Sequence, residues 1–533
     1  MVAKNSRCLF TQYSFSYSIY LRFEQTSMVY IENLQDFVGQ TVTLKGWQAN
    51  MRTGKGLLFI LLRDGSGFCQ CVVNEEEVGE ELFSALKAST LEASMEVTGL
   101  VKADERQIGG YELQVTGGTV VNESVDYPIS NKEHGVEFLM DKRHLWLRSR
   151  KQWALMRVRN AVSFEIHRFF QENGFVQMDA PILTPNAAEG TTDLFDIDFF
   201  GRPAYLSQSG QLYGEAMAMA MGRIYTFGPT FRAEKSKTRR HLSEFWMIEP
   251  EMAFYDNEKN MELIEDFIRT VVLRVIDKCK FELTEILERN LDMLRMVEKP
   301  FPRIPYTEAV KILQGKQEVN GKTSISILEE ELKATQTHIS ENQAEITDKE
   351  SLIAAGGIKK GKLNWMKNRV AQLKAENKDL SEQAENIPQW IESARNFKDG
   401  ADFGGSDETV LTKLFASPIM VYNWPTKIKA FYMKEVEGNA DFVKGVDLLA
   451  PEGYGEIVGG SERETDINVL LKKIEDHGLP QEVFEWYLDL RRYGSVPHAG
   501  FGLGLERLIT WISGTRHIRE TIPFPRMYGR AEP

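Results

Sequence analysis

Residues 230–251 read TFRAEKSKTRRHLSEFWMIEPE and contain two strand-like stretches around a basic loop. Because successive side chains of a strand point to opposite faces, Arg232 and Glu234 share one face. In the second stretch, alternation separates a group with two acidic side chains from a wholly apolar group. The first group is Phe245, Met247, Glu249 and Glu251, and the second is Trp246, Ile248, Met252 and Phe254. The pattern predicts a β-hairpin with one face in the core and the other lining a polar, anion-binding site.

The loop between the two strands is strongly basic. Five of its residues are basic or can become so, namely Lys235, Lys237, Arg239, Arg240 and His241. Charge-assisted hydrogen bonds from such groups suit phosphate. A solvated hairpin with surface ion pairs is the alternative, and the patterned strands on either side favour the phosphate site.

Two further stretches carry residues that suit a nucleotide site. In GVDLLAPEGYGEIVGGSERE (445–464), Asp447 and Glu456 are isolated acids in otherwise apolar strands and need a compensating charge. Mg²⁺ takes one or two carboxylates together with substrate phosphates, which fits this pair. In PHAGFGLGLERLI (497–509), three alternate glycines are expected to form a turn before a buried helix, where Arg507 lies behind them.

Length and composition limit the class of protein. The chain has 533 residues, 42% of them hydrophobic and 26% charged, which indicates several globular domains and excludes a fibrous or disordered chain. No apolar run reaches the length that crosses a bilayer, so no membrane association is expected. The net charge of −13 does not suggest a nucleic-acid binder, although an acidic protein can contain a local basic groove. Four cysteines without a CxxC pair indicate reduced thiols and a cytoplasmic protein.

The order of expected elements divides the chain. Residues 28–125 contain three strands, a helix and two strands, which predicts an OB-fold barrel, with a purely structural β-barrel as the alternative. Residues 126–148 are a polar hinge, and residues 149–533 predict an α+β domain with a mainly antiparallel sheet. Residues 1–27 are an N-terminal extension, either an upstream stretch before a start at Met28 or a basic, Ser-rich targeting segment.

Residues 316–396 interrupt the second domain. Two runs of apolar residues at heptad spacing flank Gly356 and Gly357, which predicts an antiparallel helical hairpin. The insertion holds 12 basic and 13 acidic residues. Contact with tRNA, docking of a partner and simple decoration all remain open as its role.

These stretches resemble the three motifs of the class II aminoacyl-tRNA synthetases, and most closely those of the asparaginyl-tRNA synthetases. The first motif matches GFVQMDAP (174–181). The second matches Phe231-Arg232-x-Glu234 with Arg240-His241 and Glu244-Phe245. The third matches Gly500-x-Gly502-x-Gly504-x-Glu506-Arg507. The resemblance covers residues ~28–533 apart from the helical insertion, which departs from the family pattern.

The resemblance implies a catalytic site for ATP. Arg232 and Arg507 would be catalytic, on the α-phosphate and the γ-phosphate, and Phe245 would stack on adenine. Asp447 and Glu456 would hold Mg²⁺. The implied ATP-binding set is Arg232, Glu234, His241, Phe245, Glu456, Gly504 and Arg507. The implied reaction is ligation of L-asparagine to tRNA(Asn) through an asparaginyl-adenylate, with AMP and diphosphate as the other products.

The implied amino-acid site consists of Glu189, Gln211, Glu215 and Arg463. Aspartyl enzymes usually carry a lysine near the stretch SGQLYGEA, whereas this chain has Glu215 there. A glutamate repels a carboxylate but accepts a hydrogen bond from a carboxamide, which favours asparagine over aspartate. As a helix-surface acid, Glu215 would do neither.

The resemblance also implies partners. Arg52, Phe59 and Gln70 match positions that contact the anticodon, and Pro181 lies at the interface of a homodimer in the family. An aspartyl-tRNA synthetase-like enzyme and an ammonia-dependent asparagine synthetase relative remain as alternatives. A nucleic-acid-binding protein with a decayed catalytic domain is a third, which the intact motif residues disfavour.

Overall fold

The computed structural model describes residues 28–130, 132, 134–185, 194–236 and 238–533. They form two compact units, one ending at His134 and the other running from Gly135 to Pro533. The second unit starts before residue 149 because the short helices α3 (Val136–Asp141) and α4 (Arg143–Trp146) are held within it. The buried Arg143 guanidinium donates hydrogen bonds to the carbonyls of Ile522 and Pro523, 2.9 and 2.8 Å away.

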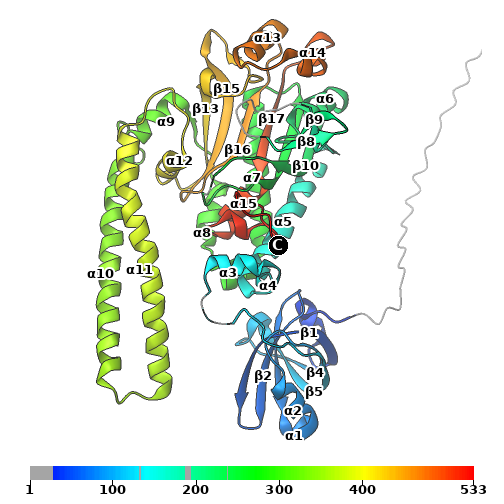
Figure 1. Ribbon diagram of the computed structural model, residues 1–533, viewed down its shortest axis with the longest axis vertical. Helices are drawn as coiled ribbons and strands as arrows, with labels where there is room; N and C mark the ends of the chain where they lie inside the picture. The colour runs from blue at the N-terminus through cyan, green and yellow to red at the C-terminus, as the bar shows by residue number, and fades with distance from the viewer. Residues whose placement is uncertain (1–27, 131, 133, 186–193, 237) are drawn as a thin grey trace, which may run out of the picture. The chain divides into compact units, whose positions relative to one another are not determined.

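The first unit is an OB-fold barrel, as the strand order predicted. Its closed sheet joins β1 (Thr41–Gly54), β2 (Leu57–Arg63), β3 (Phe68–Asn74), β5 (Tyr111–Asn122) and β4 (Ser94–Ala103), in that order (Figure 1). Alternate residues such as Leu58, Ile60 and Leu62 fill the interior. The helices α1 (Glu75–Val78) and α2 (Glu80–Ala88) stand between β3 and β4, where the sequence predicted one helix.

A nine-stranded sheet forms the centre of the second unit. Its strand order is β12 (Arg303–Pro305), β13 (Ile419–Pro425), β15 (Asn439–Ala450), β16 (Gly455–Glu462), β17 (His498–Gly504), β11 (Glu244–Ala253), β10 (Arg223–Phe231) and β6 (Val176–Met178), with β14 (Glu435–Val436) beside β15. Among the described strands of this sheet, only the β12–β13 and β10–β6 pairs are parallel, so the predicted α+β class with a mainly antiparallel sheet is confirmed.

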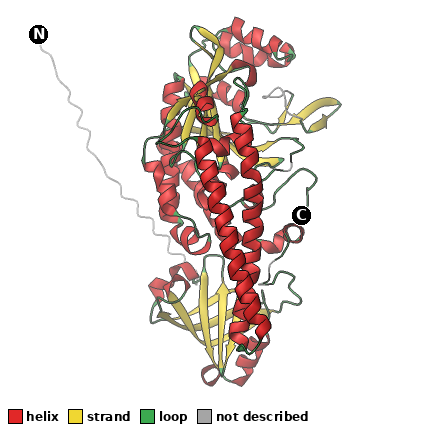
Figure 2. Cartoon of the chain, turned by 90° about the vertical axis from the view of Figure 1, so that its left-hand side faces the viewer, coloured by secondary structure: helices red, strands yellow, loops and turns green. Residues whose placement is uncertain are grey.

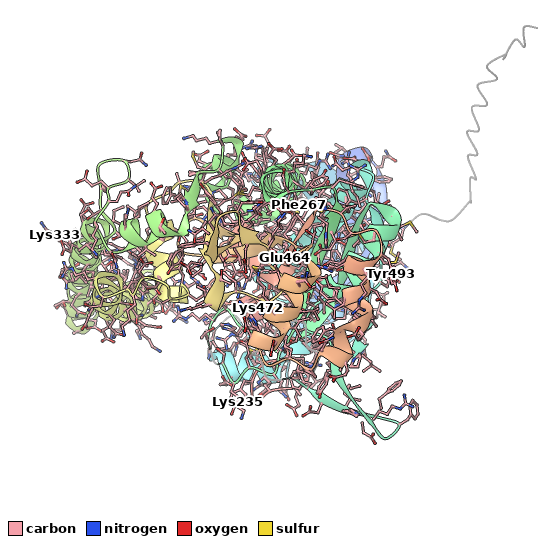
Figure 3. All side chains as sticks on the ribbon, turned by 90° about the horizontal axis from the view of Figure 1, so that it is seen from above. Lys235, Phe267, Lys333, Glu464, Lys472 and Tyr493 are labelled. Carbon is pink, nitrogen blue, oxygen red and sulfur yellow. The ribbon has the colours of Figure 1, made fainter. Side chains whose placement is uncertain are left out.

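Three helices cover one face of this sheet. They are α5 (Arg150–Glu172), α7 (Asn257–Lys278) and α15 (Leu505–Ser513). Ser149 and Asp256 cap the first two, each accepting a backbone N–H of the first turn. Their apolar faces meet Ile248 and Met252 of β11 in the core, and Phe267 lies among the side chains inside the unit (Figure 3). The opposite face of the sheet is not covered by these three helices, and it includes the polar face of the β10–β11 hairpin.

Three details of this region differ from the sequence prediction. Arg232 and Glu234 do not share the face of a strand, because β10 ends at Phe231 and residues 232–236 belong to the loop. The glycine-rich segment is not a turn but the central strand β17, paired with β16 and β11. Glycine is required there because a Cβ on Gly500 would lie 2.3 Å from the Glu251 carboxylate, and one on Gly502 would lie 2.7 Å from Met247. Phe254 is not on the core face, because it follows β11 in a left-handed turn with φ 63° and is 70% exposed.

Smaller elements surround the sheet. A three-stranded sheet pairs β7 (Leu183–Thr184) and β8 (Asp196–Phe199) with β9 (Arg202–Leu206). The remaining helices of the unit outside the insertion are α6 (Gln211–Met221), α8 (Leu291–Leu294), α9 (Tyr306–Leu313), α12 (Gly405–Thr412), α13 (Ile467–Asp476) and α14 (Glu485–Arg492). None of the helices in the described ranges is both long and apolar enough to span a membrane.

The insertion is the predicted antiparallel pair, α10 (Ser324–Ala355) and α11 (Lys360–Arg395) (Figures 1 and 2). Thr323 caps α10, and Gly356 and Gly357 allow the turn with φ of 76° and 74°. The end near α9 and α12 is built into the second unit, because Leu328 and Ile387 are fully buried in one apolar cluster with Leu313 and Trp424. The far half has a seam of its own, in which Ile346, Val370 and Leu373 are buried.

Candidate active site

Two adjacent cavities lie beside the β10–β11 hairpin, with volumes of about 100 and 450 Å³. Arg232, Met247, Glu456 and Gly502 line both of them. The polar face of β11 faces these cavities, since Phe245 lines the smaller one, Glu249 and Glu251 the larger one, and Met247 both. A ligand with two parts could therefore place one part in each cavity, with the junction between the parts beside Arg232.

The smaller cavity brings together all seven residues expected to bind ATP, which are Arg232, Glu234, His241, Phe245, Glu456, Gly504 and Arg507. The Arg232 guanidinium carbon lies 5.4 Å from the Phe245 ring centroid. Arg507, in the first turn of α15, donates to the Glu456 side chain and to its backbone carbonyl, both at 3.0 Å. A flat aromatic face and two arginines in one small cavity can hold a base and its phosphates.

The charges in this cavity are coupled. Burial, together with the charge of Arg507, lowers the pKa of His241 below its ordinary value. Burial disfavours the charged form of Glu456, but Arg507 and Lys429 outweigh it and keep the pKa of Glu456 below its ordinary value. The site therefore presents a neutral imidazole and an ionised glutamate beside two arginines, which leaves it attractive to a polyphosphate.

The basic side chains of the loop have different partners. Arg240 donates to the side chains of Glu408 and Thr409 at 3.1 and 2.8 Å. Arg239 pairs with Glu382 of the inserted hairpin. Lys237 lies outside the described residues. Within the described part of the loop, Arg240 and His241 both line the smaller cavity.

Asp447 of β15 and Glu456 of β16 lie across one strand pair, as a shared metal ion requires. A Cβ on Gly459 would lie 3.1 Å from Glu456 Oε1 and 3.5 Å from Asp447 Oδ1, so this glycine leaves open the space that both carboxylates face. Burial, with the charge of Glu456, raises the pKa of Asp447 to about 7 against the opposing charge of Lys429, whose Nζ lies 2.7 Å away. Two oxygen donors beside a phosphate-sized cavity fit Mg²⁺.

The larger cavity receives Gln211 and Arg463. Arg463 follows β16 and donates to both oxygens of Glu251, at 2.5 and 3.3 Å, and to Ser461 Oγ at 2.8 Å. These bonds use three of the five N–H groups of a guanidinium. The remaining donors suit a carbonyl or carboxylate oxygen at the end of a short side chain.

Glu215 of α6 lies behind the cavity wall and is fully buried, so it is not a helix-surface acid. Its carboxylate accepts hydrogen bonds from Tyr487 (2.8 Å), Arg491 (2.9 Å) and Gln211 (3.2 Å), and His498 Nε2 lies 2.9 Å away. Burial disfavours its charge, but Arg491 and His498 hold its pKa far below the ordinary value. Glu215 therefore does not line the cavity itself. It contacts two residues that do, Gln211 and Arg463, and its Oε1 lies 4.0 Å from Arg463 Nε. Glu189 lies outside the described residues.

Several residues that line or support this site are not among those predicted from the sequence. Lys429 and Tyr432 line the larger cavity, and the Arg463 guanidinium lies 5.2 Å from the Tyr432 ring centroid. His498 and Arg491 hold Glu215 from distant segments. Only His498 had a nearby signal, since it opens the glycine-rich segment; the others stand in ordinary surroundings in the sequence.

The barrel has a site of its own. Arg52, Phe59 and Gln70 line an open hollow of about 440 Å³ on the first unit, together with Arg106, Gln107 and Glu112. Arg52 donates to the Gln70 side chain at 3.1 Å, and its guanidinium lies 5.8 Å from the Phe59 ring centroid. Phe59 is half-buried. An accessible ring beside an amide and a guanidinium can stack on a base and read its edge.

Pro181 lies on an exposed apolar surface of the second unit. Val176, Ile182 and Leu183 around it are 43%, 44% and 41% exposed. Pro181 itself is exposed. Several exposed apolar side chains so close along the chain are typical of an interface.

Comparison with known families agrees with this geometry. Residues 135–528 match the family of class II tRNA synthetases (D, K and N), and residues 42–121 match the OB-fold nucleic-acid-binding domain. The asparagine–tRNA ligase of Pelotomaculum thermopropionicum is 45% identical over 505 residues, covering 95% of this chain and 99% of that protein. That of Deinococcus deserti is 47% identical over 507 residues, covering 94% and 99%.

Solved structures give the same result. The crystal structure of asparaginyl-tRNA synthetase from Pyrococcus horikoshii complexed with asparaginyl-adenylate has a TM-score of 0.77 and 36% identity, covering 96% of this chain and 100% of that one. The asparaginyl-tRNA synthetase of Entamoeba histolytica, also in complex with asparaginyl-adenylate, has a TM-score of 0.71 and 29% identity, covering 93% and 97%. The chain is a class II tRNA synthetase and belongs to the asparagine–tRNA ligase family.

Proposed function

We propose that this chain ligates L-asparagine to tRNA(Asn) at the expense of ATP. The observation that carries the proposal is the pair of cavities that meet at Arg232, one with the residues for a nucleotide and the other with those for a small polar amino acid. In the first step a carboxylate oxygen of asparagine attacks the α-phosphorus. The bond from that phosphorus to the bridging oxygen breaks, and diphosphate leaves.

Arg232 is the group that both substrates meet. Its charge at the junction neutralises the α-phosphate while the carboxylate approaches, so two anions can come together. No side chain has to act as a nucleophile, because the asparagine carboxylate fills that role. Catalysis then consists of positioning and charge stabilisation.

The remaining residues of the smaller cavity hold the nucleotide. Phe245 stacks on adenine, Arg507 binds the γ-phosphate, and Gly504 leaves room for the ligand. Glu234 and His241 lie beside the nucleotide. Asp447 and Glu456 would hold Mg²⁺, which would supply further neutralisation of the phosphate charge.

Selection of asparagine rests on the charges around Arg463. This arginine lies between Glu251 and Glu215, so its own charge is already balanced. Its remaining N–H groups donate to the side-chain carbonyl of asparagine, while Glu215 orients Gln211 from behind. A second carboxylate in place of the carboxamide would face excess negative charge and is disfavoured.

In the second step a ribose hydroxyl at the end of the tRNA attacks the acyl carbon of the adenylate, and AMP leaves. The barrel residues Arg52, Phe59 and Gln70 bind the anticodon. Dimerisation through the surface around Pro181 and a cytoplasmic location are also part of the proposal. The free, buried cysteines Cys69, Cys71 and Cys279 support that location.

The test is aminoacylation of tRNA(Asn) with asparagine and aspartate in parallel, with ATP–pyrophosphate exchange as the measure of the first step. We expect charging with asparagine and little with aspartate. Equal charging would favour an aspartyl-like enzyme. Formation of free asparagine from aspartate, ammonia and ATP without tRNA would favour an ammonia-dependent asparagine synthetase. Such an enzyme binds no RNA, so it would have no use for the hollow on the barrel.

A further inference from the structure

The far end of the inserted hairpin concentrates positive charge. Residues 349–369, here named the hairpin tip, contain six basic side chains and one acidic one. The rest of the insertion, residues 316–348 and 370–396, here named the stem, contains six basic and twelve acidic side chains. The insertion is nearly neutral in total, so this division is a property of its arrangement. In a chain with a net charge of −13, it marks the tip as a distinct surface.

Three lysines at the tip lie in and beside the start of α11. Lys359, Lys360 and Lys362 are all exposed, and within the described residues none forms a salt bridge. Of the three acidic side chains nearby, Glu345 and Glu350 are already engaged, whereas Asp348 is exposed. Glu345 lies 3.0 Å from Arg369 and 3.3 Å from Lys349, and Glu350 of the tip lies 2.7 Å from Lys374 of the adjacent stem.

The tip also exposes a large aromatic ring. Trp365 is 58% exposed, whereas its neighbour Met366 is buried in the seam between the helices. The seam therefore does not need Trp365. Lys349 Nζ lies 5.0 Å from the Trp365 ring centroid, which places one more cation beside the ring. An exposed aromatic among lysines is a feature of surfaces that bind nucleic acid, where rings contact bases and lysines contact phosphates.

The tip lies too far from the cavities to touch ATP or asparagine. Glu376 of α11 lines a further cavity together with Arg507, and Lys362 is 14 residues away from it, about 21 Å along a helix that rises 1.5 Å per residue. A partner of the tip that belongs to this reaction must be an extended polyanion. We propose that the hairpin tip binds the sugar–phosphate backbone of the tRNA substrate, an inference that rests on the proposed function.

The negative charge of the stem restricts the binding of a polyanion to the tip. A polyanion that lay along the hairpin would meet excess negative charge over most of its length, so only the tip offers a favourable contact. Lysine is a flexible point charge suited to phosphates whose sequence need not be read. The contact would raise affinity for tRNA in general, while the barrel hollow supplies discrimination.

The test compares two triple variants of the full-length enzyme. The tip variant is Lys359→Gln, Lys360→Gln and Lys362→Gln. The matched control is Lys333→Gln, Lys378→Gln and Lys398→Gln, which removes the same charge from exposed lysines of the stem and its base. Lys333 lies on the outer side of the hairpin (Figure 3). The measurements are pyrophosphate exchange, the KM for tRNA(Asn) in aminoacylation, and tRNA binding across a range of salt concentrations.

We expect the tip variant to keep normal pyrophosphate exchange and to raise the KM for tRNA roughly tenfold or more at about 0.1 M salt. The slope of log affinity against log salt should fall by about one for each lost phosphate contact. The control should match the wild type in all three measurements.

An unchanged KM and slope in the tip variant would overturn the inference while leaving the charging activity, and so the proposed function, in place. An equal loss in the control would also overturn it, since net charge alone would then be responsible. Unchanged tRNA binding together with lost binding to vesicles of anionic phospholipid would assign the tip to a membrane instead. If the wild type charges no tRNA with asparagine, the proposed function itself fails.

Discussion

Gly500 shows how a missing side chain makes room for a charge pair. On β17 it faces Glu251 of β11, and the Glu251 carboxylate occupies the place where a Cβ would be. Glu251 can therefore lie flat against the sheet and present both oxygens to Arg463. Gly500 thus helps to position Arg463 in the amino-acid cavity, because it leaves room for Glu251, although the glycine contacts no substrate itself.

Gly500→Ala should therefore weaken asparagine binding. A methyl group 2.3 Å from the carboxylate forces Glu251 away from Arg463, at a cost of about 1–3 kcal/mol in stability. We expect the KM for asparagine in pyrophosphate exchange to rise severalfold. Gly228→Ala on β10 is the control, because nothing lies within 4 Å of its Cβ position. A normal KM in folded Gly500→Ala protein would contradict this account.

Arg507→Ala should abolish adenylate formation. The substitution removes a charge from the smaller cavity and leaves Glu456 without its nearest cation, so the site loses its attraction for the end of the triphosphate. We expect a loss of about 100-fold or more in pyrophosphate exchange, similar to the removal of one group that stabilises a transition state. Arg492→Ala, which breaks exposed ion pairs on α14, is the control and should have little effect. Near-normal exchange by Arg507→Ala would exclude the role.

Glu215→Gln should mainly change selectivity. The substitution keeps the shape of the buried network but removes a negative charge 4.0 Å from Arg463. The negative charge around Arg463 then falls by one, so an aspartate carboxylate meets less repulsion and activity with aspartate should rise relative to asparagine. Pyrophosphate exchange with each amino acid gives the ratio. A ratio equal to that of the wild type would leave Glu215 a structural residue only.

Residues that share a motif could be predicted from the sequence, and residues joined only by folding could not. The seven predicted nucleotide residues meet in one cavity because their motifs lie on three neighbouring strands and the helix after them. Lys429, Tyr432 and Arg491 come from segments without glycine or charge patterning. Their contacts with Asp447, Arg463 and Glu215 exist only once distant chain segments are packed together.

At the scale of elements, periodicity predicted the barrel strands, the β10–β11 hairpin and the inserted helices. Heptad spacing and a Gly-Gly turn left little choice for α10 and α11. The central strand β17 was missed, because alternate glycines usually indicate a turn. Here they leave space for side chains of the neighbouring strand β11, a reason that becomes visible only when strand pairing is known.

The hairpin should be separable in its far half and not at its base. Deleting residues 339–376 and joining His338 to Asn377 through a short glycine linker joins facing positions, since Asn377 donates to the Ile339 carbonyl at 3.4 Å. We expect this variant to keep pyrophosphate exchange and its melting temperature. Deleting residues 320–393 removes Leu328 and Ile387 from their cluster and should lower the melting temperature and solubility. Equal behaviour of the two deletions would contradict this division.

At the scale of the whole molecule, the proposed function assigns the reading of RNA to one unit and the chemistry to the other. The hollow with Phe59 belongs to the first unit, and both cavities belong to the second. A change in one unit should therefore leave the partial reaction of the other intact.

Phe59→Ala should weaken charging of tRNA and spare pyrophosphate exchange. Removing a half-buried ring takes away a stacking contact worth about 1–3 kcal/mol, which corresponds to a KM increase of roughly 5- to 150-fold. Lys45→Gln is the control, because it also lies on the barrel surface and breaks only one exposed ion pair, with Glu96. Equal losses in both reactions of Phe59→Ala would show that the ring only maintains the fold.

The charge separation along the hairpin has a consequence for encounters in solution. An acidic stem and a basic tip form an electric dipole fixed to the body of the enzyme. The field of an approaching polyanion exerts a torque on such a dipole and turns the tip toward it before any contact is made. The insertion would then orient the enzyme toward tRNA during diffusion. It would affect the association rate more than the strength of the final complex.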